Sequence, residues 1–351
     1  YFPAGGGSGM SLTDAEHERL RGAFERQLDV GLHHGAQLAV YKDGELVVDF
    51  AGGTTGPDGD ETTSDQRHVI FSCTKPYVAV AIHQLVEENQ LAYDDRLVEY
   101  WPEFADEETE KAEITVEHVL SHTSGIPVGE LDEQPEKWTD WNAVVEAMEN
   151  IEPMFTPGEQ PAYHPTNYGW LTGELVRRVT GDGVRDVVAE RVFDPLGMDQ
   201  TSIGLDEDDD PAEVATLAGF AEFDRCRNPG EGLGIPASDS AAQFNDPALQ
   251  RAVIPAANGI STARDMARFY ACLANGGSID GVDLLALLPV YRPLDGVAAL
   301  GHRRRVRRTE RPLADAGERS RPGDPRLLEC DAVEPLHRID PEPFDPCHGR
   351  R

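Results

Sequence analysis

The chain has 351 residues, 39% of them hydrophobic, which is enough for one large domain or two interleaved ones. Its 64 acidic residues outnumber 31 basic ones, giving a formal net charge of −33. Such a surface repels nucleic acid and anionic membranes, so we exclude both as partners. No stretch of sequence approaches the roughly 20 apolar residues that a membrane-spanning helix requires.

The charge and the cysteines also indicate a compartment. Self-repulsion on this scale is best tolerated where salt screens it, because the Debye length falls to about 3 Å at 1 M. We therefore expect a halophilic protein in a salt-rich cytoplasm. The five cysteines are widely spaced and include no C-x-x-C pair, which fits a reducing compartment and argues against a zinc site or disulfide framework. The first ten residues lack the charged and apolar regions of a signal peptide, and with the cysteine usage this predicts a cytoplasmic protein. The absence of zinc-binding and nucleotide-binding motifs predicts that it uses no metal or cofactor.

The first third of the chain mixes helix and strand patterns. An amphipathic pattern predicts a helix over residues 12–30. Two strands are then predicted, Gln37–Tyr41 and Glu45–Phe50, joined by Lys42-Asp43-Gly44, a turn that contains the Asp-Gly hairpin signal. A short apolar segment, residues 69–71, comes directly before Ser72.

Residues 76–88 have almost no polar face, which predicts a helix buried on most sides. Further helices are predicted at Thr115–Ser121, Trp141–Asn150, Tyr168–Thr180 and Asp265–Ala274.

These elements indicate an α/β (α+β) fold in two domains. We expect residues 10–75 and 255–290 to form an antiparallel sheet flanked by helices, and residues 76–254 to form an inserted, mostly helical domain. Residues 291–351 differ in character, with 13 basic residues, all arginine, against 11 acidic ones and many prolines. We favour an irregular tail outside the fold, as a shifted reading frame would produce, over a partner-binding tail or an ordinary divergent one. The sheet would then be incomplete.

One motif offers a nucleophile. The sequence lacks the G-x-S-x-G, H-E-x-x-H and G-x-G-x-x-G motifs of other enzyme classes. It contains Ser72-Cys73-Thr74-Lys75, in which the i, i+3 spacing on a helix places an ammonium beside a hydroxyl. A serine attacks poorly unless a neighbouring group takes its proton, and burial would lower the lysine pKa enough for it to accept or relay one.

Several segments, in order, carry a family resemblance: FSCTKPYVAVAIHQLVEENQLAYDDRL, ITVEHVLSHTSGIP, AYHPTNYGWLTGELVRRVTG and residues 245–277. Together they resemble the serine β-lactamase-like superfamily, in the branch of class C β-lactamases and family VIII carboxylesterases. The resemblance covers roughly residues 12–285 and implies a β-lactamase/transpeptidase-like fold. It implies that Ser72 is acylated, with its N–H as half of an oxyanion hole, and that Lys75 is its proton partner. Tyr163 would be the general base, a role that its ordinary pKa near 10 permits only beside a cation such as Lys75.

The chain departs from the family pattern at two places. The Y-x-N motif reads Tyr163-His164-Pro165, and the loss of its asparagine favours ester over lactam cleavage. His164 could donate a hydrogen bond to the substrate instead, or make an ordinary loop contact. The K-T-G or H-x-G strand expected after residue 290 is not found, and only Gly301-His302 is reminiscent of it. The resemblance implies that this strand supplies the other oxyanion donor and an edge of the substrate cleft, so we expect an incomplete site. We interpret residues 122–125, His-Thr-Ser-Gly, as a turn closing a helix.

The leading hypothesis is a serine esterase that acts on a small-molecule ester or amide through an acyl-enzyme on Ser72. A β-lactamase or D-amino-acid peptidase with the same nucleophile is the second hypothesis. A catalytically impaired binding protein, lacking the last strands of the sheet, is the third. The sequence leaves the natural substrate and the oligomeric state open.

Overall fold

The helices and the hairpin that the sequence predicts are present in the predicted order, and further short helices and strands lie between and after them. The computed structural model describes residues 12–218 and 242–286. The helices are α1 Asp14–Asp29, α2 Lys75–Glu87, α3 Val116–Leu120, α4 Trp141–Asn150, α5 Asn167–Thr180, α6 Val184–Val188, α7 Asp194–Leu196, α10 Pro247–Arg251 and α11 Ala263–Ala274. The strands are β1 Gly35–Lys42, β2 Glu45–Gly53, β3 His68–Val69, β4 Ser202–Ile203, β5 Gly259–Ser261, β6 Ser278–Ile279 and β7 Val282–Asp283.

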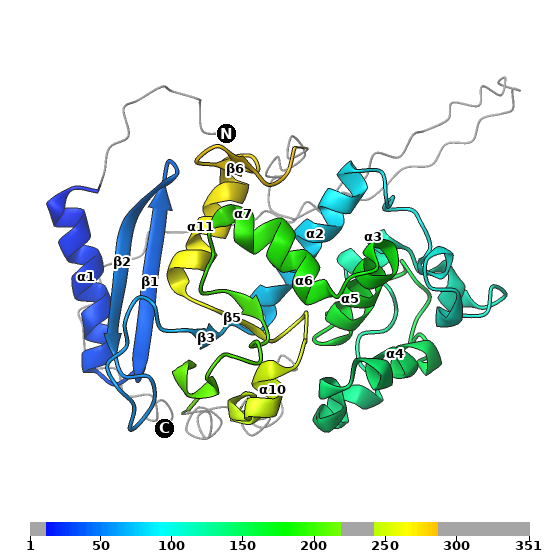
Figure 1. The fold of residues 1–351 in the computed structure, drawn as a ribbon, viewed down its shortest axis with the longest axis horizontal. Helices are drawn as coiled ribbons and strands as arrows, with labels where there is room; N and C mark the ends of the chain where they lie inside the picture. The colour runs from blue at the N-terminus through cyan, green and yellow to red at the C-terminus, as the bar shows by residue number, and fades with distance from the viewer. Residues whose placement is uncertain (1–11, 219–241, 287–351) are drawn as a thin grey trace, which may run out of the picture. The chain divides into compact units, whose positions relative to one another are not determined.

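The predicted hairpin is confirmed, and a helix covers each of its faces (Figure 1). Asp43 and Gly44 both adopt positive φ, as a tight turn between twisted strands requires. Successive strand residues point to opposite faces. Phe50 therefore packs against Phe24 of α1, while the neighbouring Asp49 binds Arg264 of α11. The mixed helix and sheet architecture that the sequence predicts is thus present.

A small second sheet connects the hairpin side of the molecule to the helices. Its three strands are antiparallel in the order β3-β5-β4, so β5 occupies the centre. Helix α2 follows β3 and packs against α5 and α6. Six apolar side chains of α2 are buried, which confirms the prediction of a helix enclosed on most sides: Tyr77, Val78, Val80, Ala81, Ile82 and Leu85.

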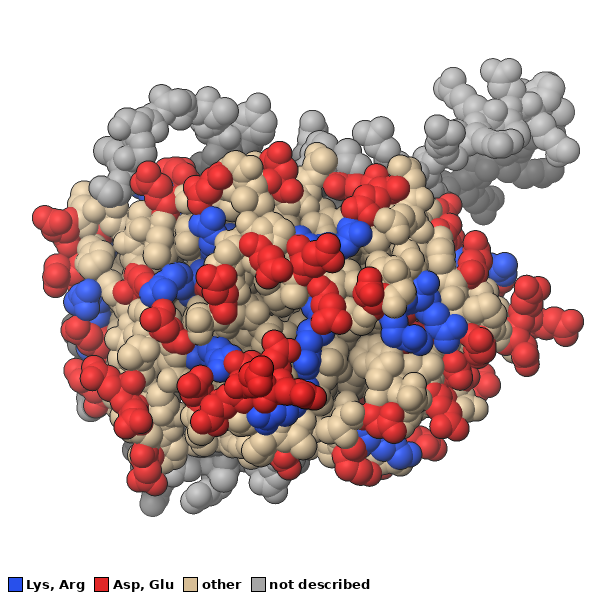
Figure 2. Space-filling model, in the orientation of Figure 1, with Lys and Arg blue, Asp and Glu red and all other residues tan. Residues whose placement is uncertain are grey.

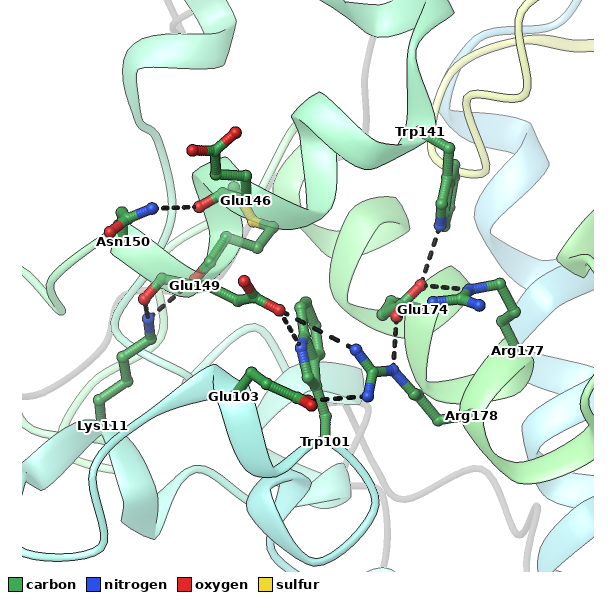
Figure 3. A network of polar contacts seen from close by, with 11 residues as sticks. Trp101, Glu103, Lys111, Trp141, Glu146, Glu149, Asn150, Glu174, Arg177 and Arg178 are labelled. Carbon is green, nitrogen blue, oxygen red and sulfur yellow. Dashed lines mark hydrogen bonds and ion pairs between the residues drawn. The ribbon is translucent and has the colours of Figure 1, made fainter.

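A charged network holds the helical part together around Glu174 of α5 (Figure 3). The Glu174 side chain is fully buried and accepts hydrogen bonds from Arg177, Arg178 and Trp141. Arg178 also forms an ion pair with Glu103 at 2.8 Å. Burial alone would raise the pKa of Glu174, but these hydrogen bonds and charges lower it below its usual value. The network therefore fixes α5 against α4 and the 3₁₀ turn that contains Glu103.

The surface carries the charge excess of the sequence. On the face drawn in Figure 2, Asp and Glu side chains are spread widely, and Lys and Arg form smaller groups between them. Across the two described stretches, none of the helices has the length and apolar character needed to cross a membrane. The predicted irregular tail, residues 291–351, lies outside the described residues.

Candidate active site

A strained turn precedes Ser72. Phe71 has φ 46° and ψ −130°, an unusual conformation for a bulky residue, which costs on the order of 1–3 kcal/mol. The turn is held by a bridge between Phe71 and Asn258 and by packing of the Phe71 ring on Phe244, at 5.3 Å between centroids. Ser72 begins a 3₁₀ helix, Ser72–Thr74, that leads into α2. The nucleophile candidate thus lies one turn before the α-helix proper and is exposed.

Thr74 ties this turn to the central strand of the small sheet. Its hydroxyl donates to the Phe71 carbonyl and accepts the Gly259 N–H of β5 at 2.7 Å. A Cβ at position 259 would lie 2.5 Å from Thr74 Oγ1, so only glycine allows this approach. The position of Ser72 is therefore set by β5 as well as by its own helix.

Lys75 makes three hydrogen bonds that join distant parts of the chain. Its Nζ donates to Ser72 Oγ at 3.1 Å, to the Pro165 carbonyl at 2.7 Å and to the Ala256 carbonyl at 3.0 Å. An ammonium group has three N–H donors, and all three are satisfied here. Lys75 consequently holds together the start of α2, the segment before α5 and the loop before β5.

Burial changes the acidity of this lysine. The residue is only 7% exposed, and burial lowers its pKa to about 8. Within the described part of the chain, no carboxylate is among the groups that shift this pKa. A lysine with this pKa can change its charge near physiological pH.

Tyr163 lies 91 residues after Ser72 in the sequence but contacts it in the structure. Its phenol hydroxyl donates to Ser72 Oγ at 2.7 Å, and Lys75 Nζ lies 5.0 Å from the centroid of its ring. The tyrosine is 56% exposed, so the phenol oxygen is at the surface of the site while the lysine is buried beneath it. The structure thus brings Ser72, Lys75 and Tyr163 into one hydrogen-bonded cluster.

His164 lies beside this cluster but is completely buried. Its Nδ1 contacts the Ala162 carbonyl, and its Nε2 lies 2.8 Å from Ser124 Oγ. Burial lowers the pKa of His164 to about 4, so the ring is neutral at pH 7. Nδ1 then carries the proton, because a carbonyl only accepts, and Nε2 accepts from Ser124. A direct contact with the substrate stays a prediction, and this geometry favours a positioning role instead.

Sequence reasoning missed three parts of this arrangement. The carbonyl groups of Pro165 and Ala256 had no side-chain signal, since any residue supplies a carbonyl. The motif at residues 122–125 does close α3, as predicted, because Thr123 N–H donates to the His118 carbonyl. In addition, the His122 ring packs against Tyr163 at 4.9 Å between centroids, which the motif alone did not reveal.

The N–H of Ser72 is the predicted donor to a substrate oxygen. Outside the regular helices and strands it makes no backbone hydrogen bond among the residues that the structure describes, and its role as an oxyanion donor stays a prediction. The segment expected to supply a second donor, after residue 290, lies outside the described residues. In the described ranges, no group of His, Cys, Asp and Glu side chains could hold a metal ion.

Comparison with known proteins places this chain in a family. The beta-lactamase family model matches residues 20–318. The chain belongs to the beta-lactamase family. The esterase/beta-lactamase LipL of Mycobacterium tuberculosis is 33% identical over 267 residues, which are 72% of this chain and 61% of that protein. The resemblance seen in the sequence is confirmed.

Solved structures agree with this membership. A penicillin-binding protein homolog from Caulobacter crescentus is 33% identical with a TM-score of 0.63, over 79% of this chain and 74% of the other. A family VIII carboxylesterase is 28% identical with a TM-score of 0.64, over the same shares of the two chains. The chain spans 61% of the length of LipL and 45% of penicillin-binding protein 4 of Amycolatopsis lactamdurans.

Proposed function

We propose that this member of the beta-lactamase family is a serine hydrolase that cleaves small esters through an acyl-enzyme on Ser72. The observation that carries the proposal is the contact of Ser72 Oγ with both Lys75 Nζ and Tyr163 Oη, at 3.1 and 2.7 Å. A hydroxyl that lies within hydrogen-bond distance of two groups able to exchange protons is the arrangement that nucleophilic catalysis requires.

In the proposed acylation step Tyr163 reacts as its phenolate, having lost its own proton to solvent. Ser72 Oγ then attacks the ester carbonyl carbon while the phenolate oxygen takes the hydroxyl proton. The Lys75 ammonium stabilises the negative charge that the phenol oxygen carries when it acts as the base. The N–H of Ser72 would donate to the oxygen of the tetrahedral intermediate. When the carbon–oxygen bond of the ester breaks, Tyr163 returns the proton to the leaving alkoxide.

In deacylation, water would be the attacking group and Ser72 would be the leaving group. A water molecule attacks the acyl carbon, and Tyr163 Oη takes its proton. The bond between the acyl carbon and Ser72 Oγ then breaks, and Tyr163 returns the proton to Ser72. The exposed phenol oxygen suits both steps, since water and the leaving group approach from solvent.

Two observations support esters over lactams as substrates. One is that a structural neighbour is described as a family VIII carboxylesterase, whereas the description of LipL names both an esterase and a beta-lactamase. In this chain Pro165 replaces the asparagine of the Y-x-N motif, and its carbonyl oxygen binds Lys75. Proline has no side-chain amide to hold the amide group of a lactam.

Covalent labelling of Ser72 tests the proposal directly. A fluorophosphonate probe should label the wild-type protein and its Cys73→Ala variant, but not Ser72→Ala. Cys73→Ala is the matched control because Cys73 is the adjacent exposed nucleophile. Mass spectrometry of the labelled peptide locates the adduct. A wild-type protein that binds esters without labelling or turnover would instead support the binding-protein hypothesis.

We also propose a cytoplasmic location in a salt-rich cell. The two cysteines in the described ranges, Cys73 and Cys272, are unpaired, which fits a reducing compartment. The strongly acidic composition supports the salt-rich environment. Fractionation of the source cells tests this, and recovery of the protein outside the cytoplasm would contradict it.

A further inference from the structure

His122 contacts the segment of Tyr163 at three points. Its carbonyl oxygen accepts the Ala162 N–H at 2.9 Å. Its Nδ1 accepts the His164 N–H at 3.1 Å. Its ring packs on the ring of Tyr163, with centroids 4.9 Å apart. His122 therefore binds the residue on each side of Tyr163 as well as Tyr163 itself.

Few other contacts restrain the tyrosine. Tyr163 is 56% exposed, and in the described part of the chain its one side-chain hydrogen bond is to Ser72. A phenol ring held only at its tip would rotate away from the nucleophile, because a single hydrogen bond contributes about 1 kcal/mol net. Lys75 Nζ lies 5.0 Å from the centroid of the Tyr163 ring, and His122 supplies the remaining restraint through the tilted ring contact and the bonds to the Ala162 and His164 N–H groups.

His122 is itself held rigidly. It follows α3 with φ 60°, a left-handed conformation that non-glycine residues adopt rarely. Its ring also packs on the buried Tyr168 of α5, at 5.0 Å between centroids. The left-handed backbone conformation of His122 thus places its imidazole ring between Tyr163 and Tyr168 of α5.

We infer that His122 is a positioning residue that holds the phenol of Tyr163 over Ser72 through the His164 N–H and the contact between the two rings. The inference rests on the proposed function for its kinetic consequences, and on the contacts alone for its structural ones. This role of His122 is in addition to its place in the turn that ends α3. Burial lowers the pKa of His122 to about 4, so its Nδ1 is free to accept at neutral pH.

The first test needs no activity. Amide exchange at His164 is measured in the wild-type protein, His122→Ala and His122→Asn. Asparagine tolerates left-handed φ and offers an oxygen near the position of Nδ1, so it should keep the protection of His164, whereas alanine should lose it. Equal exchange in wild type and His122→Ala would overturn the inference. His118→Asn is the matched control, since His118 Nδ1 accepts the Thr115 N–H but makes no ring contact with Tyr163.

The second test is a double-mutant cycle on ester hydrolysis. His122→Ala should lower kcat/KM by about 10²-fold, the scale of a small misplacement of a catalytic group, and His122→Asn should recover part of it. In the Tyr163→Phe background the same change should have little effect, because the group that it positions is gone. An equal loss in both backgrounds would show a general structural role and overturn the inference. Melting temperatures of all variants separate instability from misplacement.

The two tests also separate this inference from the proposed function. If the wild-type protein is neither labelled by the fluorophosphonate nor active on esters, the proposed function fails. The exchange of His164 then decides whether His122 holds the segment of Tyr163.

Discussion

Lys75 Nζ donates to the carbonyl oxygen of Ala256 at 3.0 Å, across 181 residues of sequence. A second bond, to the Pro165 carbonyl, spans 90 residues. The lysine is thus held by two backbone groups that cannot lose or gain protons, and only its third contact, Ser72 Oγ, belongs to the proposed reaction. The charge state of Lys75 can therefore be followed through the pH dependence of the acylation rate and of the free energy of unfolding.

The pH dependence of acylation should show an alkaline limb near the Lys75 pKa of about 8. Below that pH the lysine is charged and stabilises the phenol oxygen of Tyr163 as a base. Above it the charge is lost and kcat/KM for p-nitrophenyl acetate should fall by up to about 10-fold per pH unit. Stopped-flow measurement of the acylation burst reports this limb. A rate that keeps rising through pH 8 would make neutral Lys75 the base instead.

Stability should respond to the same group with a definite sign. The pKa of Lys75 is lowered from 10.5 to about 8 in the folded state, so between these values the unfolded chain holds the proton and the folded chain does not. Stability therefore rises with pH in this window, by at most about 1.4 kcal/mol per pH unit. Urea titrations of wild type and Lys75→Met should show that this rise is absent in the variant. Parallel pH curves for the two proteins would argue against the lowered pKa.

Substrate preference should favour esters. Because the segment at Tyr163 has a proline where the family motif has asparagine, p-nitrophenyl acetate should be hydrolysed with a higher kcat/KM than a chromogenic cephalosporin. We expect Pro165→Asn to shift the ratio toward the cephalosporin if the amide is what the site lacks. Equal kcat/KM values for the two substrates in the wild-type protein would contradict the preference.

The network around Glu174 should contribute to stability rather than to the rate. Glu174→Gln removes a buried charge that two arginines bind, at a cost on the order of 2 kcal/mol, reduced from fully buried pairs because both arginines are partly exposed. Glu103→Gln is the control, since its carboxylate is exposed and should matter little. The pKa of Glu174 is lowered below 4.5, so its contribution is present above that pH and is lost as the pH falls. Chemical denaturation at neutral and acidic pH checks both statements, and an equal cost for the two variants would contradict them.

Salt should raise the melting temperature. Residues 10–290 contain 18 basic and 53 acidic residues, because 13 and 11 respectively lie in residues 291–351, so the net charge of this part is −35. Between about 0.1 and about 3 M KCl the Debye length falls from about 10 Å to below about 3 Å, which screens this repulsion. Differential scanning calorimetry across the series should show a steady rise. A flat or falling curve would mean that the charge is compensated locally and that the halophilic origin is wrong.

Local patterns were sufficient to predict the hairpin, the longer helices and the S-x-x-K motif. The Asp-Gly turn, the apolar helix after Lys75 and the S-x-x-K spacing are short-range features, so the sequence by itself determined the hairpin, α2 and the pairing of Ser72 with Lys75. The family resemblance added Tyr163, which no local pattern links to Ser72.

The tertiary structure decided what surrounds these residues. The acceptors of Lys75 are carbonyl groups of Pro165 and Ala256, and every residue has a carbonyl, so no side-chain pattern could point to them. His164 stands next to Tyr163 in sequence, yet it is buried against Ser124, because its direction depends on how the segment packs against residues 122–125. The contact of His122 with Tyr163 likewise exists only once α3 and α5 are packed together.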